Sequence, residues 1–437
     1  MTYSEKAIQK LTGIEEGDYL KVKTIEYELE GILLPSLELN ETDFVKIKIN
    51  SGYNLGIDCR KAEFSLVRKK KEQTIQPKKY KVNKIEGLNK IGLITTGGTI
   101  SSKVDYTTGG VKALMKPEEY VESNKDLMEI AEIESIRMPF NRMSEDLNPS
   151  HWSIIAKEVA ELLNSGLHGI IVTHGTDTLH YTSAALSFAL GNLRKPVAVV
   201  GAQKSADRGS FDGFLNLTCA ARYAASNYSG VKLIMHYTNS DDYCQLIHGC
   251  KARKMHSSAR NAFRSINEKP QALINKEEFK VLSEDLKENY ESTPTELFDK
   301  FEEKVGLVKI HPGFNPSILQ AYSNYKGIII EGTGLGHVPT NGELSLIPEI
   351  KRLVESGVLV GITTQCIYGT VNDRVYSNLR ILKNTGAIFC EDMHSETAFV
   401  KLSWVLANTN SIQEAETQMK ENLRGEFSRG LNEEWML

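Results

Sequence analysis

A chain of 437 residues with 41% hydrophobic and 25% charged residues has an ordinary globular composition and enough length for two or three domains. The formal net charge of -4 excludes a strongly basic protein, so binding to nucleic acid would require a local patch or a partner. No apolar stretch approaches the roughly 20 residues that cross a bilayer, and the start lacks the apolar core of a signal peptide. We therefore expect a cytoplasmic protein without membrane contact. The six cysteines are too sparse for a disulfide scaffold, and no metal site is expected from their spacing.

The first 67 residues are predicted to form a small β-barrel domain. Apolar and polar residues alternate there in short segments that Gly, Pro and Asn separate, which is typical of strands with one buried face. The candidate strands are 19–23, 30–34, 44–49 and 54–57. A basic stretch at 68–87 begins with a run of four basic residues from Arg68. We interpret it as a solvated linker, and docking on RNA phosphates stays open as the alternative.

From residue 88 the pattern changes to short apolar strands that alternate with helical segments. The candidate strands are 91–95, 169–173, 197–201, 231–235, 305–310, 327–331 and 358–363. Such alternation predicts βαβ units and mostly parallel sheets. The expected fold class is therefore α/β, with the small barrel in front of a two-domain core and a helical tail at the end.

The helices of this core are predicted from apolar residues at helical spacing. One helix is expected over 150–165, with Ser150 as its N-cap and an end at Gly166. Another follows Ser395, and an amphipathic tail helix begins at Ser411. The apolar face of the tail helix either packs on its own domain or forms an interface with a partner, and both interpretations stay open.

A charged stretch over 276–304 divides the core. It separates the first four strands from the last three, and we expect it to be partly helical. The prediction is an N-terminal α/β domain at 88–290, which carries the threonine motifs described next, and a smaller C-terminal α/β domain with the helical tail at 291–437.

Two threonine-rich motifs end strands of the predicted N-terminal domain. The sequence TTGGTI at 95–100 follows one apolar run, and THGTDT at 173–178 follows another. Ligands of α/β proteins bind beyond the carboxyl ends of the strands, so the two motifs are expected to share one pocket. Alone, the first motif would equally fit a tight connection or a phosphate-binding turn.

The residues around the motifs suit nucleophilic chemistry. A threonine hydroxyl is a poor nucleophile at neutral pH and must lose its proton to a base as it attacks. Thr176 stands beside the carboxylate of Asp177, and Lys254 is a candidate base for it. Tyr106, in a glycine-rich loop, can form a hydrogen bond with an attacking hydroxyl. Backbone N–H groups of the glycine turns can bind an oxyanion, so these parts together suit acyl transfer from an amide.

Each of these residues also has a plain structural interpretation. Asp177 can cap a helix, Lys254 can be a surface charge and Tyr106 can pack in its loop. His174 is expected to be structural, because its neighbours already supply a nucleophile and an acid. The joint occurrence of the two motifs favours a catalytic site over these separate interpretations.

The two motifs resemble the threonine signatures of the L-asparaginase family. The resemblance runs from about residue 90 to 406 and includes DYT at 105–107, VGAQ at 200–203 and GTGLGH at 332–337. By this resemblance Thr99 matches the nucleophile and Tyr106 its supporting partner. Thr176, Asp177 and Lys254 match a second triad. Ser144 and Glu145 match the positions that hold the α-amino and α-carboxylate groups of the substrate, a task that Asp177 shares.

One element of that family has no clear counterpart in this chain. In bacterial-type asparaginases an acid from the neighbouring subunit completes the Thr and Tyr pair, and no residue after 365–369 fills that place. Asp373 is nearby but is not assigned to it. The pocket of the family is commonly completed across a two-fold interface, so the resemblance implies a homodimer.

The flanks resemble one branch of the family, the D subunits of archaeal glutamyl-tRNA(Gln) amidotransferases. This resemblance implies a glutaminase that supplies ammonia to a GatE-type subunit, in a heterotetramer of two D and two E chains. ATP and Mg would be used by that partner, which would also make most of the contact with tRNA(Gln), and this chain would need no cofactor. The absence of a P-loop pattern agrees with ATP being used elsewhere. The alternatives are a free-standing L-asparaginase and a tRNA-binding adaptor without activity.

Overall fold

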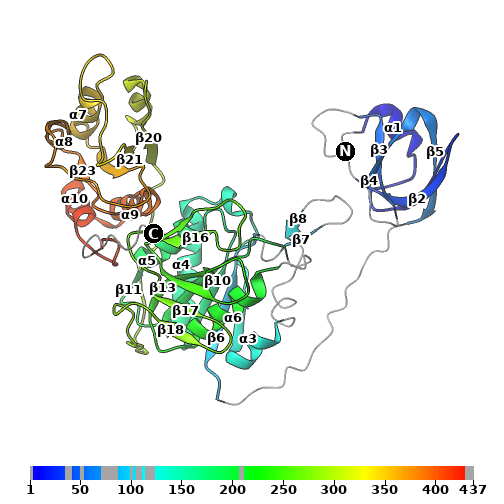
Figure 1. Cartoon of the computed structure of the whole chain (residues 1–437), viewed down its shortest axis with the longest axis horizontal. Coiled ribbons are helices and arrows are strands. Elements are labelled where there is room, and N and C mark those ends of the chain that lie inside the picture. Colours follow the sequence, from blue (N-terminus) through cyan, green and yellow to red (C-terminus); the bar gives the residue numbers. More distant parts are fainter. Residues whose placement is uncertain are drawn as a thin grey trace. The chain divides into compact units, whose positions relative to one another are not determined.

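The computed structural model describes residues 3–34, 42–49, 54–69, 87–98, 102–104, 111–113, 124–205 and 211–428, with the backbone alone at 102–104 and 111–113. The chain divides into two compact units, one of residues 1–83 with 103–114 and one of residues 84–102 with 115–437 (Figure 1). Among the described helices, none has the length and apolar character needed to cross a membrane.

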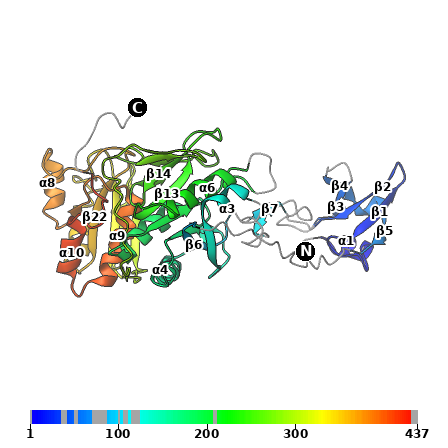
Figure 2. The same cartoon turned by 90° about the horizontal axis from the view of Figure 1, so that it is seen from below.

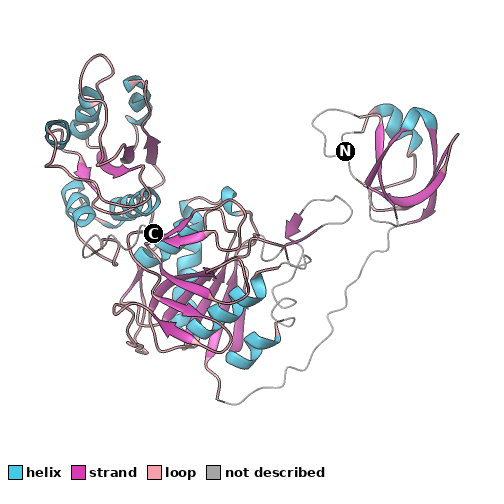
Figure 3. Cartoon of the chain, viewed as in Figure 1, coloured by secondary structure: helices cyan, strands magenta, loops and turns pink. Residues whose placement is uncertain are grey.

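The first unit is built around a five-stranded antiparallel sheet of order β4-β3-β2-β1-β5. Figure 3 shows the strands of the chain in magenta. Its elements are α1 (Glu5–Lys10), β1 (Tyr19–Thr24), β2 (Glu28–Leu33), β3 (Phe44–Ile49), β4 (Asn54–Asp58) and β5 (Ala62–Arg68). Alternate residues such as Leu20 and Val22 are buried in one core with Val45 and Ile47. This alternation is what the sequence pattern predicts, whereas β5 is a strand that the pattern did not reveal. The strands β7 (Ser102–Val104) and β8 (Val111–Ala113) form a separate two-stranded sheet.

An eight-stranded sheet forms the centre of the second unit. Its order is β18 (Phe279–Val281), β17 (Ala272–Ile274), β14 (Cys244–His248), β13 (Gly230–His236), β12 (Pro196–Val200), β10 (Gly169–Thr173), β6 (Lys90–Thr95) and β9 (Glu132–Arg137). The five strands from β13 to β9 are parallel, and β14, β17 and β18 join antiparallel. Since β6 and β10 are direct neighbours, their carboxyl ends lie side by side.

Helices cover both faces of this sheet. The helices α3 (Lys125–Ile130) and α6 (Gly213–Ala224) contribute to the core of one face, and α4 (Pro149–Asn164) and α5 (Leu179–Ala189) to that of the other. Strand β10 shows why its sequence is continuously apolar: Ile171 enters the first core, while Ile170 and Val172 enter the second. The predicted cap of α4 is corrected, because the side chain of Asn148, rather than Ser150, accepts the N-terminal hydrogen bond.

The C-terminal part contains a parallel sheet of order β20 (Val305–Lys309), β21 (Gly327–Gly332), β22 (Leu359–Thr364) and β23 (Ile388–Phe389). Its helices are α7 (Ile347–Glu355), α8 (Ser377–Lys383), α9 (Ser395–Asn408) and α10 (Ile412–Lys420), and Figure 2 shows them from a second side. Helices α9 and α10 share a core with Ala184, Ala185 and Phe188 of α5. The two halves of the second unit are therefore held together by apolar packing.

The charged stretch at 276–304 differs from the prediction. Its regular structure is extended: it contains β18 and the short strand β19 (Glu296–Leu297), which pairs with β11 (Leu190–Gly191). A further pair, β15 (Ala252–Lys254) and β16 (Phe263–Ser265), forms a two-stranded sheet outside the eight-stranded one. The α/β class with a β-rich front domain is confirmed.

Candidate functional site

The first threonine motif is fastened to the second at the ends of their strands. Thr95 stands opposite Thr173 in the register of β6 and β10. One residue later, the Thr96 backbone N–H and its Oγ1 hydroxyl both donate to the Thr173 carbonyl oxygen, at 3.1 and 3.0 Å. Thr96 is buried and its hydroxyl proton is committed, so this side chain holds the two motifs together and is not a free nucleophile.

The glycines of the two motifs allow their backbones to touch. Gly98 has a φ of +79°, and a Cβ at this position would lie 2.4 Å from Gly175 Cα. A Cβ on Gly175 would in turn lie 2.7 Å from Ser144 Oγ. Neither gap admits a side chain, so the turn at 97–98, the turn at 174–176 and Ser144 form one continuous surface. The two motifs therefore lie against each other, and that they share one pocket stays a prediction.

His174 is buried inside this surface and is neutral. Its Nδ1 lies 2.7 Å from the Gly175 carbonyl oxygen, and its Nε2 lies 2.9 Å from Thr182 Oγ1. A carbonyl only accepts, so Nδ1 is the donor and Nε2 accepts from the threonine hydroxyl. Burial lowers the pKa of His174 to about 4, which keeps the ring uncharged at neutral pH. The ring fixes the Gly175 turn, as expected of a structural residue.

The structure brings Lys254, Thr176 and Asp177 together. Lys254 Nζ donates to Thr176 Oγ1 at 2.8 Å and to Asp177 Oδ1 at 2.7 Å. Thr176 is buried at the end of β10, the Lys254 side chain is 11% exposed at the end of β15, and the Asp177 side chain is 64% exposed. A hydroxyl and an amine in direct contact can exchange a proton, while the exposed carboxylate remains accessible to a ligand.

Ser144 and Glu145 begin the short 3-10 turn Ser144–Asp146 beside the Gly175 turn. Ser144 is buried and Glu145 is exposed. The Thr178 hydroxyl donates to the Ser144 carbonyl oxygen at 2.8 Å, so the last threonine of the second motif fixes this turn. Sequence reasoning assigned Thr178 no such role, although its place in the motif was visible.

Thr99 and Tyr106 lie outside the described residues. Gly98, which precedes Thr99, is described and contacts Gly175 as above. Gly97 has a φ of +107° and lies against the backbone of Arg142, whose N–H donates to the Thr96 carbonyl oxygen at 3.0 Å. The turn leading to Thr99 is thus held on both sides.

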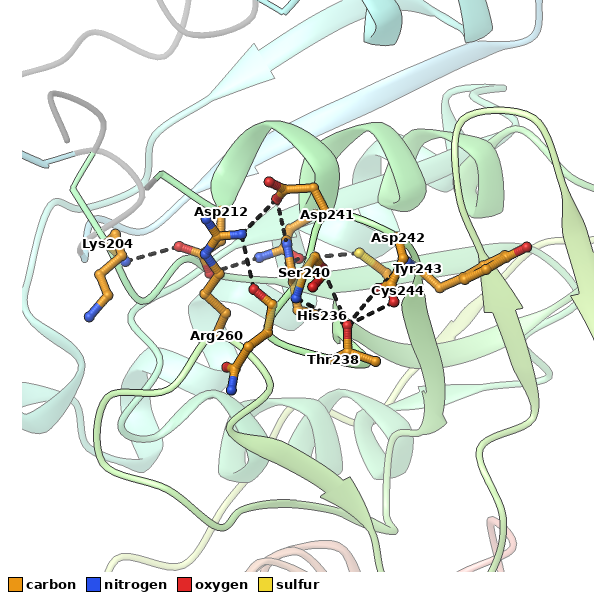
Figure 4. Close-up of polar contacts among 12 residues, drawn as sticks. Lys204, Asp212, His236, Thr238, Ser240, Asp241, Asp242, Tyr243, Cys244 and Arg260 are labelled. Atoms are coloured by element: carbon orange, nitrogen blue, oxygen red, sulfur yellow. Dashed lines mark hydrogen bonds and ion pairs between the residues drawn. The ribbon is translucent and has the colours of Figure 1, made fainter. Parts of the chain in front are cut away.

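A polar network supports the neighbouring strand ends (Figure 4). Asp212 accepts from the backbone N–H groups of Gln203 and Lys204, and Asn216 donates to both Asp212 and the Gly201 carbonyl oxygen. The network continues through His236, whose Nδ1 lies 2.6 Å from Asn216 Oδ1 and whose Nε2 lies 3.1 Å from Asp241 Oδ1. Arg260 also binds Asp241, at 2.8 Å. Burial alone would raise the pKa of Asp241, but its bonds with His236 and Arg260 lower it. A Cβ on Gly201 would lie 2.9 Å from Thr176 Cγ2, so this network also supports the second triad.

Comparisons with known proteins cover nearly the whole chain. The model of the N-terminal asparaginase domain matches residues 90–287, that of the glutaminase/asparaginase C-terminal domain matches 304–419, and that of the GatD N-terminal domain matches 14–67. Among solved structures, the thermostable L-asparaginase from Thermococcus kodakarensis is 28% identical with a TM-score of 0.68, and covers 78% of this chain and 100% of its own. L-asparaginase I from Vibrio cholerae is 29% identical with the same TM-score, over 78% of this chain and 99% of its own.

Relatives of higher identity extend over the front domain as well. The D subunit of the glutamyl-tRNA(Gln) amidotransferase from Pyrococcus furiosus is 46% identical over 96% of both chains. The protein of the same description from Methanothermobacter thermautotrophicus is 39% identical over 98% of both. The chain therefore belongs to the family of glutamyl-tRNA(Gln) amidotransferase D subunits, whose core is that of the L-asparaginases.

Proposed function

We propose that this chain is the glutamine-hydrolysing subunit of a tRNA-dependent amidotransferase that converts Glu-tRNA(Gln) to Gln-tRNA(Gln). The observation that carries the chemistry is the contact of Lys254 with Thr176 beside the joined turns at 97–98 and 174–176. An amidohydrolase needs a nucleophile, a proton acceptor and oxyanion donors within one small space. In our proposal Lys254 is the proton acceptor, and backbone N–H groups at the turns bind the oxyanion; the contact of Lys254 with Thr176 supports the first of these roles.

In the proposed first step, the Thr99 hydroxyl attacks the side-chain amide carbon of glutamine. The proton of that hydroxyl passes through the Thr176 and Lys254 pair to the departing nitrogen, which leaves as ammonia. Tyr106 supports the attacking oxygen. Water then hydrolyses the ester on Thr99, which releases glutamate and restores the hydroxyl. Ser144, Glu145 and Asp177 hold the α-amino and α-carboxylate groups of the substrate, consistent with the exposure of Asp177 and Glu145.

The ammonia is used in the second half of the reaction. In our proposal a GatE-type partner activates the γ-carboxyl group of tRNA-bound glutamate as a phosphate ester, with its own ATP and Mg, and ammonia displaces the phosphate. The partner makes most of the contacts to tRNA(Gln), and two copies of this chain join two partner chains. This chain needs no cofactor of its own and acts in the cytoplasm. The names of the relatives, which are subunits of an amidotransferase, support this assignment.

A free-standing L-asparaginase is not favoured. The two L-asparaginase structures cover 78% of this chain, whereas the two amidotransferase relatives cover 96% or more. The GatD N-terminal domain matches residues 14–67, a region that an asparaginase does not need for its chemistry. The presence of the front domain therefore favours a subunit of a larger complex over a free-standing enzyme.

The experiment compares ammonia release from glutamine and asparagine by the purified chain, alone and with the partner and Glu-tRNA(Gln). We expect the partner and charged tRNA to raise glutamine use. We also expect Thr99→Ala to abolish glutamine-dependent amidation and to leave amidation with ammonium salts intact, because only the ammonia source is lost. A full asparaginase rate that the partner leaves unchanged would refute the proposal. Loss of both activities in Thr99→Ala would refute the assigned role of Thr99.

A further inference from the structure

The strand that carries Lys254 is bound by both halves of the second unit: Ala252 packs in the core of α4 and α5, and neighbouring residues contact the C-terminal half. β15 lies outside the eight-stranded sheet and pairs only with β16 among the described strands. The residues just before Lys254 are bound by the segment at 392–397. The Thr397 hydroxyl donates to the Cys250 carbonyl oxygen at 2.8 Å, and Lys251 Nζ contacts Asp392 Oδ2 at 2.8 Å with both side chains buried.

Arg253 extends this attachment to the residue next to Lys254. Its Nε lies 3.0 Å from Glu396 Oε1, with the two side chains 23% and 12% exposed. Successive side chains of a strand point to opposite faces, so Arg253 reaches Glu396 while Lys254 reaches Thr176 on the other side. The Arg253–Glu396 pair thus fixes the backbone from which the Lys254 side chain extends.

Glu396 is itself held in place at the first turn of α9. Its other oxygen, Oε2, lies 3.0 Å from His394 Nδ1, and His394 Nε2 lies 3.0 Å from Thr397 Oγ1. Burial alone would raise the pKa of Glu396, but the hydrogen bond with His394 and the charges of His394 and Arg253 lower it well below the ordinary value. The carboxylate is therefore charged at neutral pH and has a fixed direction.

We propose that Glu396 is a positioning residue for amide cleavage, which acts through Arg253 to hold Lys254 against Thr176. This inference rests on the proposed function, because it assigns to Glu396 the support of the second triad. Glu396 does not touch Thr176 or Asp177 in the described contacts, so its effect must pass through β15. The C-terminal half then contributes to the chemistry of a site whose described residues come from the N-terminal half.

The variant to test is Glu396→Gln in the complete complex with the partner and charged tRNA. Gln keeps the shape of Glu and removes its charge, so Arg253 loses its ion pair and β15 loses one of its attachments. Misplacing a catalytic group by a fraction of an ångström to 1 Å lowers rates by about ten- to a hundredfold. We expect about a tenfold lower kcat for glutamine-dependent amidation, KM for glutamine within about twofold, and unchanged kcat with ammonium. Glu355→Gln is the control, because it removes the carboxylate of the exposed Lys351–Glu355 pair in the same half.

A second measurement separates positioning from general damage. Glu396→Gln is introduced into Lys254→Met, and residual glutamine cleavage is followed at high enzyme concentration. If Glu396 acts through Lys254, the double variant is no slower than Lys254→Met alone. An undiminished tenfold loss in that background, an equal loss with ammonium, or full activity of Glu396→Gln would each overturn the inference. Full activity of Lys254→Met itself would instead refute the role of the second triad in the proposed function.

Discussion

Replacing Lys254 with Met removes one amino group and keeps most of the side-chain volume. In the structure this ends two contacts of Nζ, at 2.8 Å to Thr176 Oγ1 and 2.7 Å to Asp177 Oδ1. Loss of a general acid or base typically lowers a rate by about 10²- to 10⁴-fold, which equals about 3 to 5 kcal/mol of activation free energy. We expect kcat for ammonia release from glutamine to fall by that factor.

The effect of Lys254→Met on folding should be much smaller. The Asp177 side chain is 64% exposed, and exposed ion pairs contribute about 1 kcal/mol or less to stability. The hydrogen bond to Thr176 adds about 1 kcal/mol. Thermal unfolding and ammonium-dependent amidation should therefore stay close to those of the unmodified chain.

The assay measures ammonia release at saturating glutamine in the complete complex, next to amidation from ammonium chloride. Lys351→Met is the matched control, because it removes a lysine of an exposed ion pair in α7. A glutaminase rate within threefold of normal would refute the assignment of Lys254 as the proton acceptor. A parallel fall of both rates would show that the substitution damages the fold or the assembly instead.

Two further predictions concern the surface around the triad. Gly98→Ala should abolish glutamine use and lower the melting temperature, because the new Cβ would lie 2.4 Å from Gly175 Cα at a φ of +79°. Gly342→Ala is the control, because Gly342 also has a positive φ but has open space around it. Normal activity of Gly98→Ala would contradict the packing argument. His174, with a pKa of about 4, binds fewer protons than the unfolded chain between about pH 6.5 and 4, so stability falls as the pH is lowered through this window. His174→Gln should remove about 2 kcal/mol of the stability loss between pH 6.5 and 5, measured by denaturant unfolding, and an unchanged pH dependence would refute it.

Much of the core could be predicted from its apolar runs. The predicted strand at 169–173 is β10, and the strands predicted at 91–95 and 327–331 differ from β6 and β21 by one residue at one end. These strands are buried on both faces, so their sequences are apolar throughout and their limits are visible. The stretch at 276–304 was predicted wrongly because its charges fit a solvated helix, whereas β18 and β19 are edge strands whose side chains are mostly exposed.

Local interactions explain the smaller errors. Ser150 has the residue type of an N-cap, but Asn148 forms a capping box with His151, and no hydrophobic pattern distinguishes the two positions. Strand β5 was missed because its second half is exposed and leads into a basic run. In both cases the deciding contact is made by one side chain or one strand pairing that the sequence period does not reveal.

For the candidate site, some residues could be placed together from the sequence and others only from the structure. The motifs at 95–100 and 173–178 stand at the ends of neighbouring strands, so their meeting follows from the parallel sheet alone. Lys254 stands 78 residues beyond Thr176 on a strand outside that sheet, and no periodicity places it near the motifs. Its residue type made it a candidate base, and the resemblance to a family gave it a place in the second triad, whereas no sequence signal pointed to Arg253 and Glu396.

The amide-cleaving site depends on the two halves of the second unit in different ways. The turns at 97–98 and 174–176 are held to each other by hydrogen bonds and glycine contacts within the N-terminal half. The strand β15 packs on the N-terminal half through Ala252 and is also bound by Asp392, Glu396 and Thr397, next to and within α9. A shift of α9 would thus reach Lys254 through β15 and the second threonine motif through α5, which shares a core with α9.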